Sequence, residues 1–150
     1  MTARTFSYEI NRTSTAPPEV LFRLETDAPR WAEWGRPLKA GWDREADEPG
    51  GVGAIRRVGA GPVQMFEETV VYERNQRHVY KFARRPLMRD YRAEVTFTPN
   101  ASGGTDLCWR GSFTESFPGT GPLVRALVGG VIAILATRLA RGAEREPVTR

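Results

Sequence analysis

The 150-residue chain contains one cysteine, Cys108, and one histidine, His78. A single cysteine excludes an intrachain disulfide, and a single histidine excludes a histidine-rich metal site. The sequence also lacks GxSxG, HExxH, CxxC and Walker-type motifs, so neither a metalloenzyme nor a classical hydrolase is expected. We therefore predict no metal and no cofactor. Cys108 lies between Leu107 and Trp109 and is interpreted as a small packed strand residue.

Long runs of one charge are absent as well. The chain has 22 Lys and Arg against 18 Asp and Glu, a net charge of +4, and these charges are scattered. This pattern does not favour nucleic-acid binding. The hydrophobic fraction of 40% and the length suit one globular domain over residues 1–150, with 144–150 as a frayed tail. Because the N-terminus has no apolar leader segment, we expect a cytoplasmic protein.

Alternating polar and apolar residues dominate the first 114 positions. Residues 6–13 alternate as a half-buried strand, and Pro17-Pro18 opens a short helix that is followed by a second one carrying Trp31 and Trp34. Six further strands are predicted at 38–44, 52–58, 63–73, 77–84, 90–98 and 105–114, with turns or connections at 45–51, 59–62, 74–76, 85–88 and 99–104. Short connections between consecutive strands favour an antiparallel meander.

One apolar segment, residues 123–139, is long enough to be mistaken for a membrane span. It is interrupted by Arg125, Thr137 and Arg138 and lies at the lower limit of spanning lengths. We interpret it as a core helix that ends near Ala143 and covers the sheet, with Gly129-Gly130 as a point of close approach or bending. No stable membrane insertion is expected. The predicted fold is α+β: a curved seven-stranded antiparallel sheet, two short helices and a long C-terminal helix over an internal cavity.

The order of elements, together with several short motifs, resembles the SRPBCC (START-like, helix-grip) superfamily and within it the polyketide cyclase/dehydrase family of small bacterial proteins. The motifs cover nearly the whole chain and are 16–20 (APPEV), 31–34 (WAEW), 51–56 (GVGAIR), 68–70 (ETV), 89–93 (RDYRA), 103–109 (GGTDLCW) and 117–121 (FPGTG). The resemblance implies a deep cavity between sheet and helix. Members of the family shape and dehydrate polyketide chains or bind lipids and other apolar molecules.

Polar side chains that point into such a cavity are the candidates for chemistry. Arg56 or Arg57, and Glu67 or Glu68, must face inward because side chains alternate along a strand. The family's Gly-x-x-Arg pattern favours Arg56, and the apolar neighbours of the second pair favour Glu68. With Tyr80 these form the candidate catalytic set, whereas His78 is interpreted as a surface residue. The predicted ligand-binding residues are Trp34, Val70, Tyr72, Tyr91, Val95, Phe97, Trp109, Leu127, Val131 and Leu135.

Three functional hypotheses follow. The first is a binding protein for a hydrophobic, aromatic or polyketide- or lipid-like small molecule. The second is a cyclase or dehydratase in which Arg56, Glu68 and Tyr80 move protons. The third is a non-catalytic protein-interaction module that uses the basic surface. The sequence leaves open the choice between enzyme and carrier, and whether the chain forms a homodimer.

Overall fold

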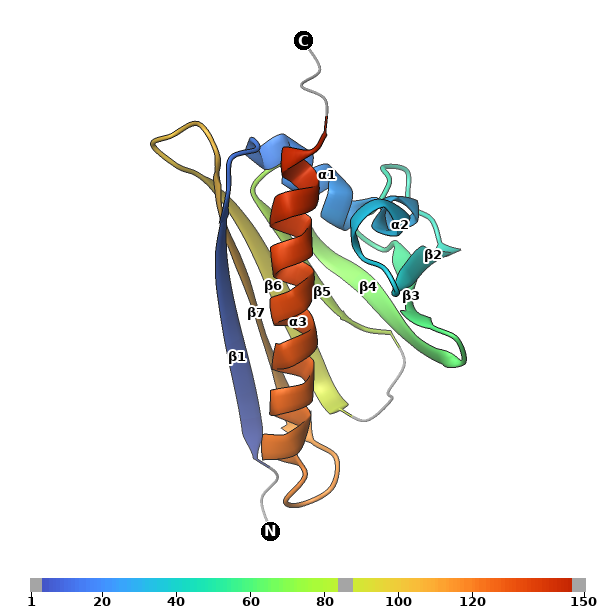
Figure 1. The fold of residues 1–150 in the computed structure, drawn as a ribbon. Coiled ribbons are helices and arrows are strands. Elements are labelled where there is room, and N and C mark those ends of the chain that lie inside the picture. Colours follow the sequence, from blue (N-terminus) through green and yellow to red (C-terminus); the bar gives the residue numbers. More distant parts are fainter. Residues whose placement is uncertain (1–3, 84–87, 147–150) are drawn as a thin grey trace.

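In the computed structural model, which describes residues 4–83 and 88–146, the chain forms one sheet with helices on one face (Figure 1). The strands are β1 (Thr5–Ser14), β2 (Lys39–Arg44), β3 (Ile55–Ala60), β4 (Val63–Glu73), β5 (Arg77–Phe82), β6 (Met88–Pro99) and β7 (Thr105–Glu115). The helices are α1 (Pro18–Thr26), the 3-10 turn η1 (Ala28–Arg30), α2 (Trp31–Trp34) and α3 (Gly121–Glu144). This order confirms the predicted helix-grip architecture.

The seven strands are all antiparallel and follow the order β1-β7-β6-β5-β4-β3-β2. From β2 onward each strand pairs with the next in the chain, and β1 pairs with β7 over its whole length. Helix α3 packs on β1 and β7, while α1 and α2 lie beside its C-terminal half (Figure 1). The helices therefore all cover the same face of the sheet, which we call the inner face.

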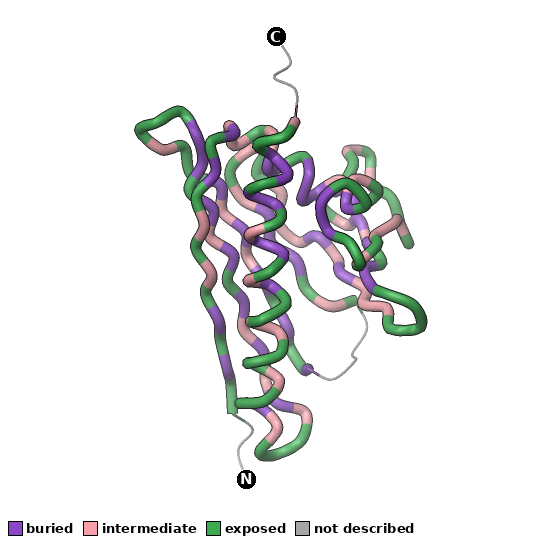
Figure 2. Tube along the Cα trace, viewed as in Figure 1, coloured by how far each residue is buried: buried purple, intermediate pink, exposed green. Residues whose placement is uncertain are grey.

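Period-two alternation produces the core. On β6 the side chains of Tyr91, Ala93, Val95 and Phe97 are buried, while the residues between them are exposed or half-buried. Figure 2 shows the same alternation of buried and exposed residues along the neighbouring strands. Because the buried set faces the helices, the core is a single layer between the sheet and α1, α2 and α3.

The predicted boundaries differ from the structure mainly around the β3–β4 hairpin. Strand β3 begins at Ile55 rather than at residue 52, and Val52 is 64% exposed. Gly59, predicted in the turn, belongs to β3, and a Cβ atom there would lie 1.9 Å from the carbonyl oxygen of Val63. Residues 85–87 of the predicted connection 85–88 lie outside the described residues, and Met88 begins β6. Residues 147–150 of the predicted tail also lie outside the described residues.

Helix α3 approaches its neighbours through glycines other than the pair that the sequence suggests. A Cβ atom at Gly121 would lie 1.9 Å from the Phe6 ring, and one at Gly142 would lie 2.9 Å from the Cβ atom of Trp34. At Gly130, by contrast, no atom lies within 4 Å of the added Cβ position. The prediction of close approach at Gly129-Gly130 is therefore wrong for Gly130. Helix α3 therefore packs most closely against its neighbours at its two ends.

By length and composition, α3 could also cross a membrane. The mean hydropathy of its most apolar 18-residue window is 1.9, and 28% of that window is buried. One such helix is weak evidence for a membrane span, because core helices pass the same test.

Gly130→Ala and Gly121→Ala test the packing of α3. At Gly130, alanine gains helix propensity without a clash, and we expect the free energy of unfolding to rise by about 0.5–1 kcal/mol. At Gly121 the added methyl group meets Phe6, whose ring stacks on Phe113, and we expect a loss of about 1–3 kcal/mol. Urea unfolding measures both changes. Equal effects of the two substitutions would contradict this description of the helix.

Candidate functional site

Four ionisable side chains are buried together on the inner face of the sheet. Glu25 comes from the last turn of α1, Arg56 from β3, Glu67 from β4 and His78 from β5, with exposed fractions of 0%, 3%, 9% and 1%. Buried charges are costly unless each is paired and hydrogen-bonded. Their presence at one point in an apolar core therefore marks this region as the candidate site.

A continuous chain of hydrogen bonds joins the four residues. Arg56 donates from Nε to Glu67 Oε1 at 2.8 Å and from Nη1 to Glu25 Oε2 at 2.9 Å. Arg56 Nη1 also donates to the backbone oxygen of Glu25 at 2.6 Å. On the other side, Glu25 Oε1 lies 2.8 Å from His78 Nδ1, and His78 Nε2 lies 2.9 Å from Thr69 Oγ1. Glu25 is thus held between an arginine and a histidine.

The hydrogen bonds of His78 use both of its ring nitrogens. The Thr69 hydroxyl donates its only proton to the backbone oxygen of Gly50 at 3.0 Å, so it must accept a proton from His78 Nε2. Both ring nitrogens of His78 are therefore engaged, Nδ1 by the Glu25 carboxyl group and Nε2 by the Thr69 hydroxyl.

The two carboxyl groups differ in acidity. Burial alone would raise the pKa of Glu25, but the positive charges of His78 and Arg56 outweigh it and lower that pKa below its ordinary value. For Glu67 burial dominates, and its pKa is raised even though Arg56 lies beside it. Burial would lower the pKa of Arg56, but Glu25 and Glu67 raise it, so the guanidinium stays charged. Glu25 is therefore a fixed anion, whereas Glu67 is the carboxyl group suited to exchanging a proton.

Aromatic rings enclose the Arg56 guanidinium. Its central carbon lies 4.9 Å from the centroid of the Trp31 ring and 4.8 Å from that of Tyr80. Trp109 Nε1 donates to the Tyr80 hydroxyl at 3.1 Å, and the hydroxyls of Tyr8 and Tyr91 are hydrogen-bonded to each other. Burial raises the pKa of all three tyrosines, which keeps their hydroxyl groups neutral. The site therefore offers neutral hydroxyl groups beside one guanidinium.

One polar group of the site has no partner. Among the described residues, Arg56 Nη2 is the buried side-chain nitrogen or oxygen atom without a hydrogen bond. A buried donor without an acceptor costs about 1–3 kcal/mol, so a buried polar atom of this kind calls for an explanation. An oxygen atom of a bound molecule would supply the missing acceptor.

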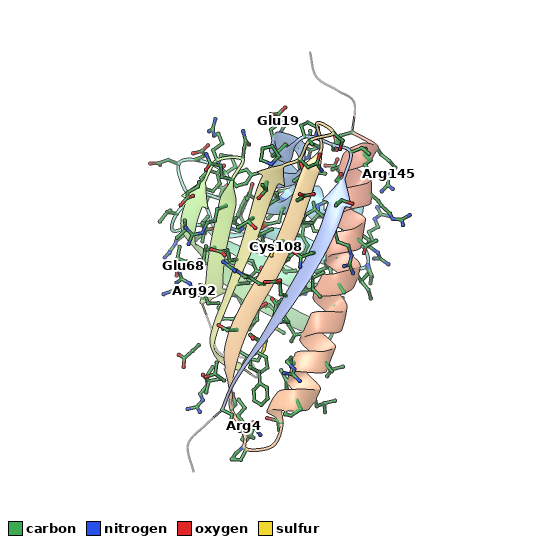
Figure 3. All side chains as sticks on the ribbon, turned by 90° about the vertical axis from the view of Figure 1, so that its left-hand side faces the viewer. Arg4, Glu19, Glu68, Arg92, Cys108 and Arg145 are labelled. Carbon is green, nitrogen blue, oxygen red and sulfur yellow. The ribbon has the colours of Figure 1, made fainter. Side chains whose placement is uncertain are left out.

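The structure places the predicted catalytic residues differently in one respect. Arg56 and Tyr80 are buried as expected, but Glu68 lies on the outer face, where Figure 3 also labels Arg92 and Cys108. Its side chain is 28% exposed and its Oε2 atom lies 3.8 Å from Arg44 Nη2. The predicted inward orientation of Glu68 is therefore wrong. The register explains why: Arg56 lies opposite Glu67, and residues directly opposite in an antiparallel pair share a face.

His78 is the second residue whose orientation the prediction missed. It is 1% exposed rather than on the surface. His78 precedes Tyr80 by two positions, so alternation along β5 places both on the inner face, and this spacing was the available signal. Glu25 and Thr69 carried no comparable signal, because their roles depend on contacts between elements that are distant in the sequence.

The predicted ligand-binding residues divide into three groups. Trp34, Tyr91, Val95, Phe97, Trp109 and Leu135 are buried in the core, and Val70 and Tyr72 are half-buried. Leu127 and Val131 are 61% and 47% exposed, so the expectation that they form the inner wall of a pocket is wrong. On α3 they lie at the exposed edge of the buried side that carries Leu135. The binding role of the other residues stays a prediction.

Two of the surface hollows lie on the far side of the sheet. One of about 690 Å³ is lined by residues that include Asn11, Thr98 and Cys108, and another of about 430 Å³ by residues that include Arg92 and Arg110. Neither is the pocket that the sequence predicts between the sheet and α3. In the described ranges, no group of three or more His, Cys, Asp or Glu side chains is placed to hold a metal ion.

Glu25→Gln tests the buried ion network through its pH dependence. Because folding lowers the pKa of Glu25, its carboxylate stabilises the folded state at pH values above its ordinary pKa of 4.5. This contribution is lost as the pH falls through the pKa of the folded state. We expect the variant to be less stable than the wild type by about 3 kcal/mol or more at pH 7, with the difference shrinking below pH ~4.5. Urea unfolding from pH 3 to 7 measures it. The matched control is Glu19→Gln, an exposed residue of the same helix, for which the difference should stay near zero.

Comparison with known proteins agrees with this fold. The chain resembles the Zhui aromatase/cyclase from Streptomyces sp. R1128, with a TM-score of 0.79, 14% identity and 95% of each chain covered. It also resembles the di-domain ARO/CYC BexL from the BE-7585A biosynthetic pathway, with a TM-score of 0.74 and 17% identity over 97% of this chain and 51% of that one. A protein from Thermobifida fusca matches with a TM-score of 0.72 and 22% identity over 97% of each chain.

No curated protein matches the sequence. A family model does match it, over residues 5–144, which include every strand and helix of the fold and all four ionisable residues of the site. The chain therefore belongs to the family described as polyketide cyclase / dehydrase and lipid transport.

Proposed function

We propose that the protein binds an apolar small molecule, aromatic or polyketide-like, between the sheet and the helices, with an oxygen atom of the ligand accepting from Arg56. The observation that carries this proposal is the buried Nη2 atom of Arg56, which has no acceptor. Membership in a family of polyketide cyclases and lipid transporters, and the likeness in fold to two aromatase/cyclase proteins, support the choice of ligand class.

The surroundings of Arg56 suit a carbonyl or phenol oxygen. Nε and Nη1 are engaged by Glu67 and Glu25, so the guanidinium is fixed in orientation and only its Nη2 donor remains available. The rings of Trp31 and Tyr80 stack against it and offer apolar area to a flat ligand. An oxygen-containing aromatic molecule would therefore give Arg56 Nη2 its missing acceptor and make apolar contacts with the rest of its surface.

Arg56→Lys tests this assignment because it keeps the charge but removes the planar fork. The probes are 2-naphthol and its oxygen-free parent naphthalene, with binding measured by fluorescence titration. We expect the wild type to prefer 2-naphthol, and the variant to bind 2-naphthol about tenfold more weakly while naphthalene is little affected.

The matched control is Arg57→Lys, the next residue of β3, which faces outward and is exposed. It should bind both probes as the wild type does. Circular dichroism and urea unfolding check that Arg56→Lys is folded under the conditions of the titration. An equal loss for the two probes, or an equal loss in the two variants, would contradict a role for Arg56 in recognising oxygen.

A second candidate function is ring closure of a poly-β-ketone chain, which the raised pKa of the Glu67 carboxyl group favours. In its ionised form, Glu67 would take a proton from a carbon between two carbonyl groups. The resulting enolate carbon would attack a second carbonyl of the same chain, and Glu67 would return the proton to the new alkoxide. Arg56 would stabilise the negative charge on oxygen throughout.

Glu67→Gln and Glu68→Gln separate this enzyme from a binding protein. Glu67→Gln should reduce kcat for cyclisation of a short poly-β-ketone thioester by about 100-fold or more, because the amide cannot exchange the proton. Glu68→Gln, one residue away on the outer face, should leave kcat unchanged. Product formation is followed by the absorbance of the aromatic ring that forms when the cyclised aldol product loses water and enolises. Equal rates in the wild type and in Glu67→Gln would exclude Glu67 as the acid–base group.

A further inference from the structure

The N-terminal half of α3 exposes a stripe of large apolar side chains, which we call the apolar stripe: Leu123, Leu127, Val131 and Ile134. Their exposed fractions are 64%, 61%, 47% and 54%. The spacings of four, four and three residues place all four on one face of the helix, which borders the buried side that carries Ile132, Leu135 and Leu139. Figure 2 shows how much of this half of the helix is exposed. A contiguous exposed apolar strip of this kind indicates a contact surface.

The same face becomes cationic toward the C-terminus. Arg138 and Arg141 follow Ile134 at spacings of four and seven, and both are exposed. From residue 121 to residue 143 the helix has three arginines and no acidic residue. The face therefore combines apolar contact with positive charge only.

A hollow lined with arginines lies beside the cationic half. It measures about 370 Å³ and is lined by Glu33, Trp34, Arg36, Arg138, Arg141 and Arg145. Figure 3 shows Arg145 beside the last turns of α3. The carboxylate of Glu33, the acidic residue of the lining, is held by Arg30 through bonds of 2.9 and 3.1 Å. The hollow therefore presents an excess of guanidinium groups to solvent.

We infer that this face of α3 docks on the surface of an anionic phospholipid bilayer. The apolar stripe would enter the boundary between headgroups and acyl chains, and the arginine-lined hollow would receive lipid phosphates. The helix lies in the plane of the bilayer, because its other side is packed on β1 and β7. This inference concerns the outer side of α3 and does not depend on the proposed function of the buried site.

Charge complementarity favours a bilayer over a second copy of the chain. A second copy would offer the same arginines, whereas the carboxylates near the end of α3 are already engaged. Glu146 pairs with Arg30 at 2.6 Å, and Glu144 accepts from the backbone N–H of Thr15 at 3.0 Å. An anionic bilayer supplies negative charge for the arginines and an apolar phase for the apolar stripe.

The test is sedimentation of the full-length protein with vesicles of phosphatidylcholine alone or mixed 3:1 with phosphatidylglycerol. We expect binding to the anionic vesicles that weakens as salt is raised from 0.05 to 0.5 M, and at least tenfold weaker binding to the neutral ones. Leu127→Asn should weaken binding to anionic vesicles about tenfold, and Arg141→Gln about fivefold. Both residues are exposed, so both variants should fold as the wild type does.

Matched controls are Val63→Asn, a 62% exposed apolar residue on β4, and Arg57→Gln, an exposed arginine on β3. Neither should change vesicle binding. Three results would overturn the inference: equal binding to neutral and anionic vesicles, loss of binding in the controls as great as in the α3 variants, or a dimer in light scattering that Leu127→Asn dissociates. The last result would assign the apolar stripe to a second copy.

Discussion

The hydrogen-bonded ion pair between Arg56 and Glu25 is the interaction on which the arrangement of the inner face depends. Through it the last turn of α1 is attached to β3, and through Glu67 and His78 the same network reaches β4 and β5. Removing one member of a buried ion pair leaves the other charge uncompensated, at a cost of about 3–5 kcal/mol. The four elements are therefore held in one geometry by charges that none of them could bury alone.

This network also divides the chemistry of the core. The sheet and α1 supply every buried charge of the site, whereas α3 contributes apolar side chains to the core. Glu25 and Glu67 lie on opposite sides of one guanidinium, yet burial and neighbouring charge move their pKa values in opposite directions. Two carboxyl groups with separated acidities, one fixed as an anion and one able to take a proton, are the usual basis of acid–base specialisation within a single site.

Local sequence patterns predicted the elements well because each strand carries its own alternation. Strand β4 begins and ends where the pattern predicts, at Val63 and Glu73. The same patterns could not choose between Glu67 and Glu68, because that choice depends on which residue lies opposite Arg56, and a shift of one residue reverses the faces. Glu25 was beyond reach for a different reason. Its importance arises from two partners that lie 31 and 53 residues away along the chain.

Helix α3 shows the limit of hydropathy as a guide to burial. An apolar composition around the whole helix predicted a core element, yet the side carrying Leu127 faces solvent. In the part of the chain that the structure describes, α3 packs on β1, β7, α1 and α2, and these contacts leave the side that carries Leu127 exposed. Stability of the fold gives no reason to keep large apolar residues there, since polar ones would serve equally well. An exposed stripe that ends in arginines therefore points to a constraint from outside the folded chain.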